Sequence, residues 1–156
     1  WDGIEACIEN VVQKYQFPNV QLGLEITEQD ALSSSIDITK KIEALKAKGH
    51  RFLIDDFGMG HTSLVYLQTK YFNIVKLDGS LTRDVIHNET NRDIIASIVY
   101  LGRSLKFKII AEYVENEAQR DELKKLGCDA FQGYLYSKPI KLDELMSWIK
   151  GSGHES

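Results

Sequence analysis

Short apolar segments recur along the chain and alternate with longer segments whose apolar residues are spaced three or four apart. The short segments are residues 20–26, 51–56, 73–77, 107–112 and 129–133. Runs of this length, bounded by polar residues or glycine, are typical of buried β-strands. The pattern therefore predicts five strands.

The longer segments predict helices. In the first, residues 2–15, Ile4, Ile8 and Val11 share one helical face. Further helices are predicted from the serines at 33–35 to about Lys48, near 62–68, and over 91–104, 116–126 and 141–150. Strict alternation of strands and helices predicts an α/β fold with a parallel sheet and right-handed crossovers. Gly49 and Gly127 are suited to end two of the helices, and the tail 151–156 is expected to be disordered.

Polar side chains that can bind metal or phosphate follow each predicted strand. They are Glu25 and Glu28, Asp55 and Asp56, Lys76 and Asp78, Glu112 and Glu115, and Gln132. In α/β folds the carboxyl ends of the strands carry the active site. Because such polar residues follow all five predicted strands, a functional site is favoured over unrelated solvated side chains.

The adjacent pair Asp55–Asp56 is the most informative of these groups. Two neighbouring carboxylates repel each other unless a cation or a hydrogen-bond donor lies between them. Mg²⁺ and Mn²⁺ prefer carboxylate oxygens, so a divalent cation is one interpretation. The other is a solvated Asp pair at a strand-to-loop turn, which is common in proteins.

Lys76 lies within a predicted strand. Alternation puts Ile74, Lys76 and Asp78 on one face, and Val75 and Leu77 on the other. If the apolar pair faces helices, Lys76 points inward, where an unpaired ammonium is costly. The acids at neighbouring strand ends favour this interpretation over a lysine that reaches out to solvent.

Composition narrows the class of protein. Apolar residues make up 43% of the 156-residue chain and charged residues 27%, which is typical of a globular domain. The net charge of −4 argues against a general nucleic-acid surface. Two cysteines suggest neither a disulfide framework nor a metal spacing, so a reducing compartment is the default expectation. No apolar run approaches a membrane span and no signal peptide is visible.

Five motifs together resemble the EAL domain family of cyclic di-GMP phosphodiesterases and their inactive relatives. They are Glu25-Ile26-Thr27-Glu28, Asp55-Asp56-Phe57-Gly58-Met59-Gly60-His61-Thr62-Ser63-Leu64, Lys76-Leu77-Asp78, Ala111-Glu112-Tyr113-Val114-Glu115, and Gln132-Gly133-Tyr134-Leu135-Tyr136-Ser137-Lys138-Pro139. They occur in the family's order and at its approximate spacing, and they cover nearly the whole chain. The resemblance implies a TIM-type (β/α)8 barrel and cleavage of one phosphodiester bond of cyclic di-GMP to give linear pGpG.

The resemblance also implies roles for the strand-end residues. Those implied to ligate Mg²⁺ or Mn²⁺ are Glu25, Asp55, Asp56 and Glu112, with Asp55 able to bridge two ions. Lys76 would lie beside the attacking water and help to hold or activate it, and Glu112 would order the site as well. The supporting residues are Glu28, which would brace the loop after the Asp pair, Asp78 at the end of the Lys76 strand, and Glu115 and Gln132, which would line the pocket.

Three residues depart from the family pattern. Met59 and His61 replace the usual Thr and Tyr of the loop, and Tyr113 stands where the family usually has Gly. His61 is open to interpretation as a metal ligand or a base, but a replacement of one aromatic ring by another is favoured. None of these changes removes an implied metal ligand.

The Glu-Ala-Leu motif that names the family does not occur in the chain, and Glu5-Ala6-Cys7 is only a chance echo on a helix. The family's metal-binding Asn is also missing. An eight-stranded barrel needs about 250 residues, so the expected fold is a partial barrel without its first three strands, in which residues 1–150 form the C-terminal portion of one EAL domain. An expressed fragment, a proteolytic product and a truncated gene all remain open as its origin. We expect the chain alone to be inactive and to self-associate through open sheet edges.

Three functions remain open on the sequence. The first is a metal-dependent phosphodiesterase of bacterial second-messenger signalling, in the cytoplasm, with any sensor or membrane domains upstream. The second is a non-catalytic EAL-like module that binds cyclic di-GMP or a protein partner. The third is an unrelated barrel enzyme, such as a metal-dependent phosphate-ester hydrolase.

Overall fold

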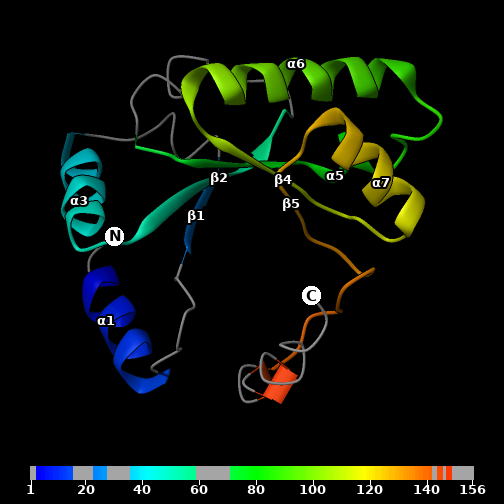
Figure 1. The fold of residues 1–156 in the computed structure, drawn as a ribbon. Helices are drawn as coiled ribbons and strands as arrows, with labels where there is room; N and C mark the ends of the chain where they lie inside the picture. The colour runs from blue at the N-terminus through cyan, green and yellow to red at the C-terminus, as the bar shows by residue number, and fades with distance from the viewer. Residues whose placement is uncertain are drawn as a thin grey trace.

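The computed structural model describes residues 3–15, 23–27, 36–58, 71–141, 144–145 and 147–148. Its elements, shown in Figure 1, follow one another as α1 (Ile4–Tyr15), β1 (Gly23–Thr27), α3 (Ile36–Ala47), β2 (Arg51–Phe57), β3 (Ile74–Leu77), α5 (Gly79–Thr82), α6 (Glu89–Leu105), β4 (Lys108–Ala111), α7 (Glu117–Leu126) and β5 (Ala130–Phe131).

The five strands form one parallel sheet in the order β1-β2-β3-β4-β5. Each strand therefore joins the sheet beside its predecessor, as the strands of a (β/α)8 barrel do. A doubly wound sheet would instead reverse direction at a switch point. The predicted α/β class, the parallel sheet and the five-stranded partial barrel are confirmed.

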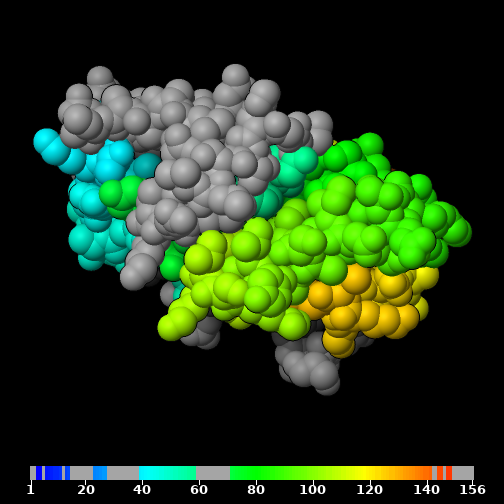
Figure 2. All heavy atoms as spheres, turned by 90° about the horizontal axis from the view of Figure 1, so that it is seen from above, coloured from blue at the N-terminus to red at the C-terminus, as the bar shows by residue number. Residues whose placement is uncertain are grey.

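One face of the sheet packs against helices. The buried strand residues on that face alternate along each strand, as the pleat requires; they are Ile26, Phe52, Ile54, Val75, Leu77, Ile109 and Ala111. The helices supply the opposing apolar side chains, which are Ile42, Leu45, Ile95, Ile98, Val99 and Leu123. Seen from above, α6 and α7 lie next to each other in the layer that covers the sheet (Figure 2). The opposite face carries the apolar residues Leu53, Ile74 and Ile110 together with the polar residues Glu25, Asp55 and Lys76.

The two long helices of this layer begin and end at residues suited to the purpose. Asn88 caps α6, and Asn116 caps α7 in a reciprocal capping box with Gln119. Helix α7 ends at Gly127, whose φ of 102° favours glycine, as predicted. Within the described residues, every helix is too short or too polar to cross a membrane.

Several boundaries differ from the prediction. Helix α6 begins at Glu89 rather than 91, because Asn88 provides the cap, and β5 has only two residues instead of five. The single-turn helix α5 was not predicted. The helix predicted near 62–68 and the tail 151–156 lie outside the described residues, and so do Glu28, Met59 and His61. Of the last predicted helix, 141–150, residue 141 is described and is not helical, whereas the described pairs 144–145 and 147–148 are helical.

Candidate metal centre and active site

A β-bulge in β2 brings two carboxylates to the polar face of the sheet. Ile54 pairs with Val75 and Phe57 with Leu77, so three steps along β2 match two along β3. Asp56 adopts a left-handed φ of 55°, which Asp tolerates better than most residues. Ile54 and Phe57 are consequently both buried in the core. The two residues between them, Asp55 and Asp56, are left for the site.

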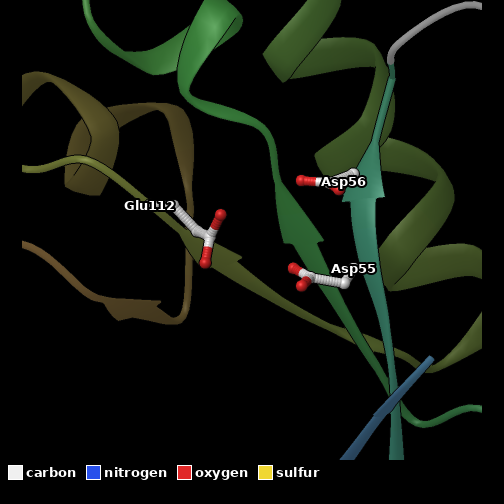
Figure 3. A group of neighbouring side chains, drawn as sticks. All are labelled: Asp55, Asp56 and Glu112. Carbon is white, nitrogen blue, oxygen red and sulfur yellow. The ribbon is translucent and has the colours of Figure 1, made fainter. Parts of the chain in front are cut away.

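Asp55, Asp56 and Glu112 form a compact acidic cluster. Each offers a carboxylate oxygen, and these three oxygens lie within 4.8 Å of one another. Figure 3 shows Asp55 and Glu112 pointing toward each other from either side of β3, with Asp56 beyond them at the end of β2. Glu112 directly follows β4. Strands β2 and β4, which flank β3, thus deliver all three acids to one edge of the sheet.

Lys76 places its ammonium group among the acids. Its Nζ lies 2.6 Å from Oε1 of Glu112, 3.0 Å from Oε2 of Glu25 and 3.1 Å from Oδ1 of Asp55. Its side chain is only 3% exposed, so these carboxylates replace the water that the ammonium loses on burial. Glu25 is outside the compact cluster and joins the site through Lys76.

The charges of this group shift two pKa values. Burial alone would lower the pKa of Lys76, but contacts with Glu112, Glu25 and Asp55 outweigh burial, and the pKa lies above its ordinary value of 10.5. Burial raises the pKa of Glu112; Lys76 opposes this rise, whereas Asp55 and Glu25 add to it. Lys76 therefore remains protonated at neutral pH, and one ammonium faces an excess of carboxylates.

The cluster fits a hard divalent cation. Oδ1 of Asp55 is buried and accepts no hydrogen bond, because its 3.1 Å approach to Lys76 lacks hydrogen-bond geometry. The Lys76 ammonium compensates this carboxylate only in part, because Glu25 and Glu112 share it, so a further cation would be favourable. Carboxylate oxygens are also the ligands that Mg²⁺ and Mn²⁺ prefer. The donor set and the unmet acceptor both favour a metal ion.

An open pocket of about 510 Å³ lies over the cluster. This volume is in the range of small-molecule sites. Its acidic lining consists of Asp55, Asp56, Glu112 and Glu115. Its remaining lining consists of Arg83, Tyr113, Gln132, Gly133 and Tyr134. The pocket thus combines a metal-binding floor with amide, aromatic and guanidinium groups.

Two buried polar side chains tie together the loops around the pocket. Thr82 Oγ1 donates to the carbonyl oxygen of Glu112 at 2.6 Å. Gln119 Oε1 accepts from the backbone N–H groups of Glu115 and Asn116, at 2.9 and 3.2 Å. Its Nε2 donates to the carbonyl oxygen of Arg83 at 2.8 Å. The segments after β3 and β4 are therefore held in a fixed relation.

Asp78 begins the first of these segments. Its carboxylate accepts a hydrogen bond from Ser80 N at 2.7 Å and caps α5. Burial acts to raise the pKa of Asp78, but the hydrogen bonds from Ser80 and Gly79 lower it overall. Asp78 therefore organises the turn that carries Thr82 and Arg83, and it lies outside the acidic cluster.

The structure unites most of the residues predicted from the strand ends. Asp55, Asp56 and Glu112 meet directly, Lys76 and Glu25 join them by ion pairs, and Glu115 and Gln132 line the pocket. Sequence reasoning missed Thr82, Arg83 and Gln119. The spacing of Asn116 and Gln119 is a capping-box signal that could have drawn attention to Gln119, whereas Thr82 and Arg83 carry no comparable local signal.

Comparisons with known proteins agree with this geometry. The family model described as the EAL domain matches residues 3–139. Cyclic di-GMP phosphodiesterase PdeF of Escherichia coli is 36% identical over 143 residues, which are 92% of this chain and 19% of PdeF. The bifunctional diguanylate cyclase/cyclic di-GMP phosphodiesterase MucR of Pseudomonas aeruginosa is 34% identical over 94% of this chain and 22% of MucR. The chain thus spans about a fifth of the length of these curated relatives.

Solved structures extend the likeness to three dimensions. The PaMucR phosphodiesterase in complex with c-di-GMP superimposes with a TM-score of 0.79 at 35% identity, covering 92% of this chain and 58% of that one. A manganese and c-di-GMP complex of Klebsiella pneumoniae BlrP1 superimposes with a TM-score of 0.78 at 28% identity, covering 89% of this chain and 36% of that one. A calcium and c-di-GMP complex of BlrP1 also matches.

Proposed function

Because the chain belongs to the EAL domain family, we propose that it forms the metal-binding portion of a domain that hydrolyses cyclic di-GMP to linear pGpG. The observation that carries this proposal is the cluster of Asp55, Asp56 and Glu112, with its buried, unsatisfied oxygen and the neighbouring ammonium of Lys76. The names of the related phosphodiesterases support the choice of substrate.

We assign the metal to Asp55, Asp56 and Glu112, with Glu25 as a further carboxylate ligand once its ion pair with Lys76 opens. Mg²⁺ or Mn²⁺ is the proposed ion, and the manganese complex of a relative supports the latter. When bound, the ion would lower the pKa of a water molecule and neutralise charge that grows on the phosphate. Glu115 and Gln132 would hold the substrate above the cluster, since both line the pocket.

Lys76 has a more restricted role than a general base. Its raised pKa keeps the ammonium protonated at neutral pH, so it has no lone pair with which to take a proton. It can donate hydrogen bonds to a water molecule or to a phosphate oxygen in the transition state. We therefore propose that Lys76 orients the attacking water and stabilises negative charge.

A cytoplasmic location is part of the proposal. Cys7 and Cys128 are both free thiols, and reducing compartments keep thiols in this state. We therefore propose that the protein binds cyclic di-GMP inside the cell.

The decisive experiment is Asp55→Asn in the whole gene product, assayed with cyclic di-GMP and Mg²⁺ or Mn²⁺. The amide keeps the side-chain shape but removes the charge, so turnover should fall by about a hundredfold or more. Asp93→Asn is the matched control, because Asp93 is an exposed residue on α6. Circular dichroism checks that both variants fold.

Parental turnover by Asp55→Asn would overturn the assignment of the site. Binding of cyclic di-GMP by the parental protein without any turnover would support the alternative of a non-catalytic module. Turnover of other phosphate esters in preference to cyclic di-GMP would favour an unrelated barrel hydrolase.

A further inference from the structure

Tyr113 adopts an unusual backbone conformation beside the acidic cluster. Its φ is 54°, a left-handed value that costs energy for a residue with a bulky side chain. The ring packs against Gly79, where any added Cβ would overlap three of its atoms. Tyr113 is nevertheless 45% exposed and lines the pocket. The chain thus holds an aromatic ring at the mouth of the site despite its conformational cost.

Arg83 lies on this ring. Its guanidinium carbon is 4.1 Å from the centroid of Tyr113, a close cation–π contact. The guanidinium makes no hydrogen bond or ion pair with any residue in the described part of the chain. Its N–H donors therefore remain available to a ligand, while the ring restricts the position of the group.

The pair is also fixed relative to the acidic cluster. Gln119 ties the carbonyl of Arg83 to the backbone of Glu115, and Thr82 binds the carbonyl of Glu112. In the sequence, Tyr113 lies between Glu112 and Glu115. Arg83, Tyr113 and the acids thus line one pocket in a preorganised arrangement. Preorganisation reduces the entropy lost on binding.

We propose that Arg83 and Tyr113 form a guanine-binding platform that selects the base of the substrate, an inference that rests on the proposed function. Tyr113 covers one face of the guanidinium, so the N–H groups at the edge of its plane are the part that can meet a base. Arginine donates two hydrogen bonds to O6 and N7 of guanine. Adenine presents an amino group in place of O6, and this donor opposes the donors of Arg83. The platform therefore favours a guanine dinucleotide over its adenine analogue.

A phosphate group could also attract Arg83, and a charge alone would suffice for that contact. The two interpretations predict different specificity. Phosphate binding would affect cyclic di-GMP and cyclic di-AMP equally, because their phosphates are identical. Base recognition would affect cyclic di-GMP selectively. Arg83→Gln separates them, since glutamine carries no charge and its amide pairs with adenine rather than with guanine.

The experiment measures equilibrium binding of cyclic di-GMP and cyclic di-AMP to the whole gene product by calorimetry, with Ca²⁺ present, as in a solved complex of a relative. Chromatography verifies that the nucleotides stay intact. The variants are Arg83→Gln, Tyr113→Asn and Tyr113→Phe. Asn tolerates a left-handed φ and removes the ring, while Phe keeps the ring and loses only the hydroxyl. Thermal melting verifies that each variant folds.

We expect parental protein and Tyr113→Phe to prefer cyclic di-GMP. Arg83→Gln and Tyr113→Asn should weaken cyclic di-GMP binding by about tenfold or more, with much less effect on cyclic di-AMP. Equal losses for both nucleotides, or an unchanged preference, would overturn the platform while leaving the proposed function intact. Failure of the parental protein to bind or hydrolyse cyclic di-GMP would overturn both.

Discussion

The hydroxyl of Thr82 donates a hydrogen bond to the backbone carbonyl of Glu112, and the two oxygens are 2.6 Å apart. Thr82 is completely buried, and it begins a link between the segments that follow β3 and β4. This bond fixes the backbone of Glu112 and thereby positions its side chain in the acidic cluster. A residue that bears no charge and touches no proposed ligand thus positions one of the metal-binding groups.

Thr82→Val removes this hydroxyl with little change of shape. It leaves a buried carbonyl unpaired, so the free energy of unfolding should fall by about 1–3 kcal/mol. Affinity for Mn²⁺ should fall as well, because Glu112 loses its support. Thr82→Ser is the matched control, since serine keeps the donor. Chemical denaturation and metal titration measure the two effects; equal behaviour of the Val and Ser variants would show that the hydrogen bond is unimportant.

Lys76→Met should destabilise the metal-free protein. The substitution leaves Glu25, Asp55 and Glu112 without their shared cation. Removing one partner of a buried ion pair costs about 3 kcal/mol or more, and the half-exposed position of Glu25 favours the lower end of that range. Denaturation at neutral pH measures the loss. Lys124→Met, at an exposed position on α7, serves as the control.

Alkaline pH provides a second test of Lys76. Its pKa in the folded protein is raised above the ordinary value of 10.5, so the folded state keeps this proton when the unfolded state releases it. The stabilisation is complete below pH 10.5 and is lost as pH rises through the higher folded value. The parental protein should therefore lose stability more steeply than Lys76→Met in this range. Parallel stability curves for the two proteins would contradict the raised pKa.

The architecture could be predicted because local patterns encode it. Five apolar runs and the intervening amphipathic segments specify the parallel sheet, and Gly127 marks the end of α7. Helix α5 escaped prediction, because a single turn of four residues has no amphipathic period. The sequence does indicate the bulge at Asp55 and Asp56. Ile54 and Phe57 are both apolar, although their spacing of three breaks the alternation of a regular strand.

The candidate site was predictable as a set of strand ends and not as a set of contacts. Parallel strands bring their carboxyl ends to one edge, which is why Asp55, Lys76 and Glu112 could be grouped. The bond between Thr82 and Glu112 joins residues 30 apart in the chain, and that between Gln119 and Arg83 joins residues 36 apart. Such pairings depend on the packed loops and leave no local pattern. Self-association and the inactivity of the chain alone remain predictions.

The two thiols should differ sharply in reactivity. Cys7 is exposed, whereas Cys128 is buried, and burial raises the pKa of Cys128 to about 12. The thiolate is the reactive form, so Cys128 is protected both by its low thiolate content and by its inaccessibility. Iodoacetamide at pH 8 should label only Cys7 in the native chain and both cysteines in denaturant. Peptide mass spectrometry identifies the sites, and rapid native labelling of Cys128 would contradict its burial.

The contact between Gly79 and Tyr113 can be tested by a double-mutant cycle that needs no ligand. An alanine Cβ at position 79 would overlap the ring of Tyr113, so Gly79→Ala should lower the free energy of unfolding by about 1–3 kcal/mol. In a Tyr113→Gly background the ring is absent, and alanine should then be neutral or stabilising, because Gly79 lies in helix α5 and alanine favours helices. The expected coupling energy is about 1–3 kcal/mol. Chemical denaturation of the four proteins measures it; additive effects would show that the ring does not lie on Gly79, and the platform formed with Arg83 would lose its support.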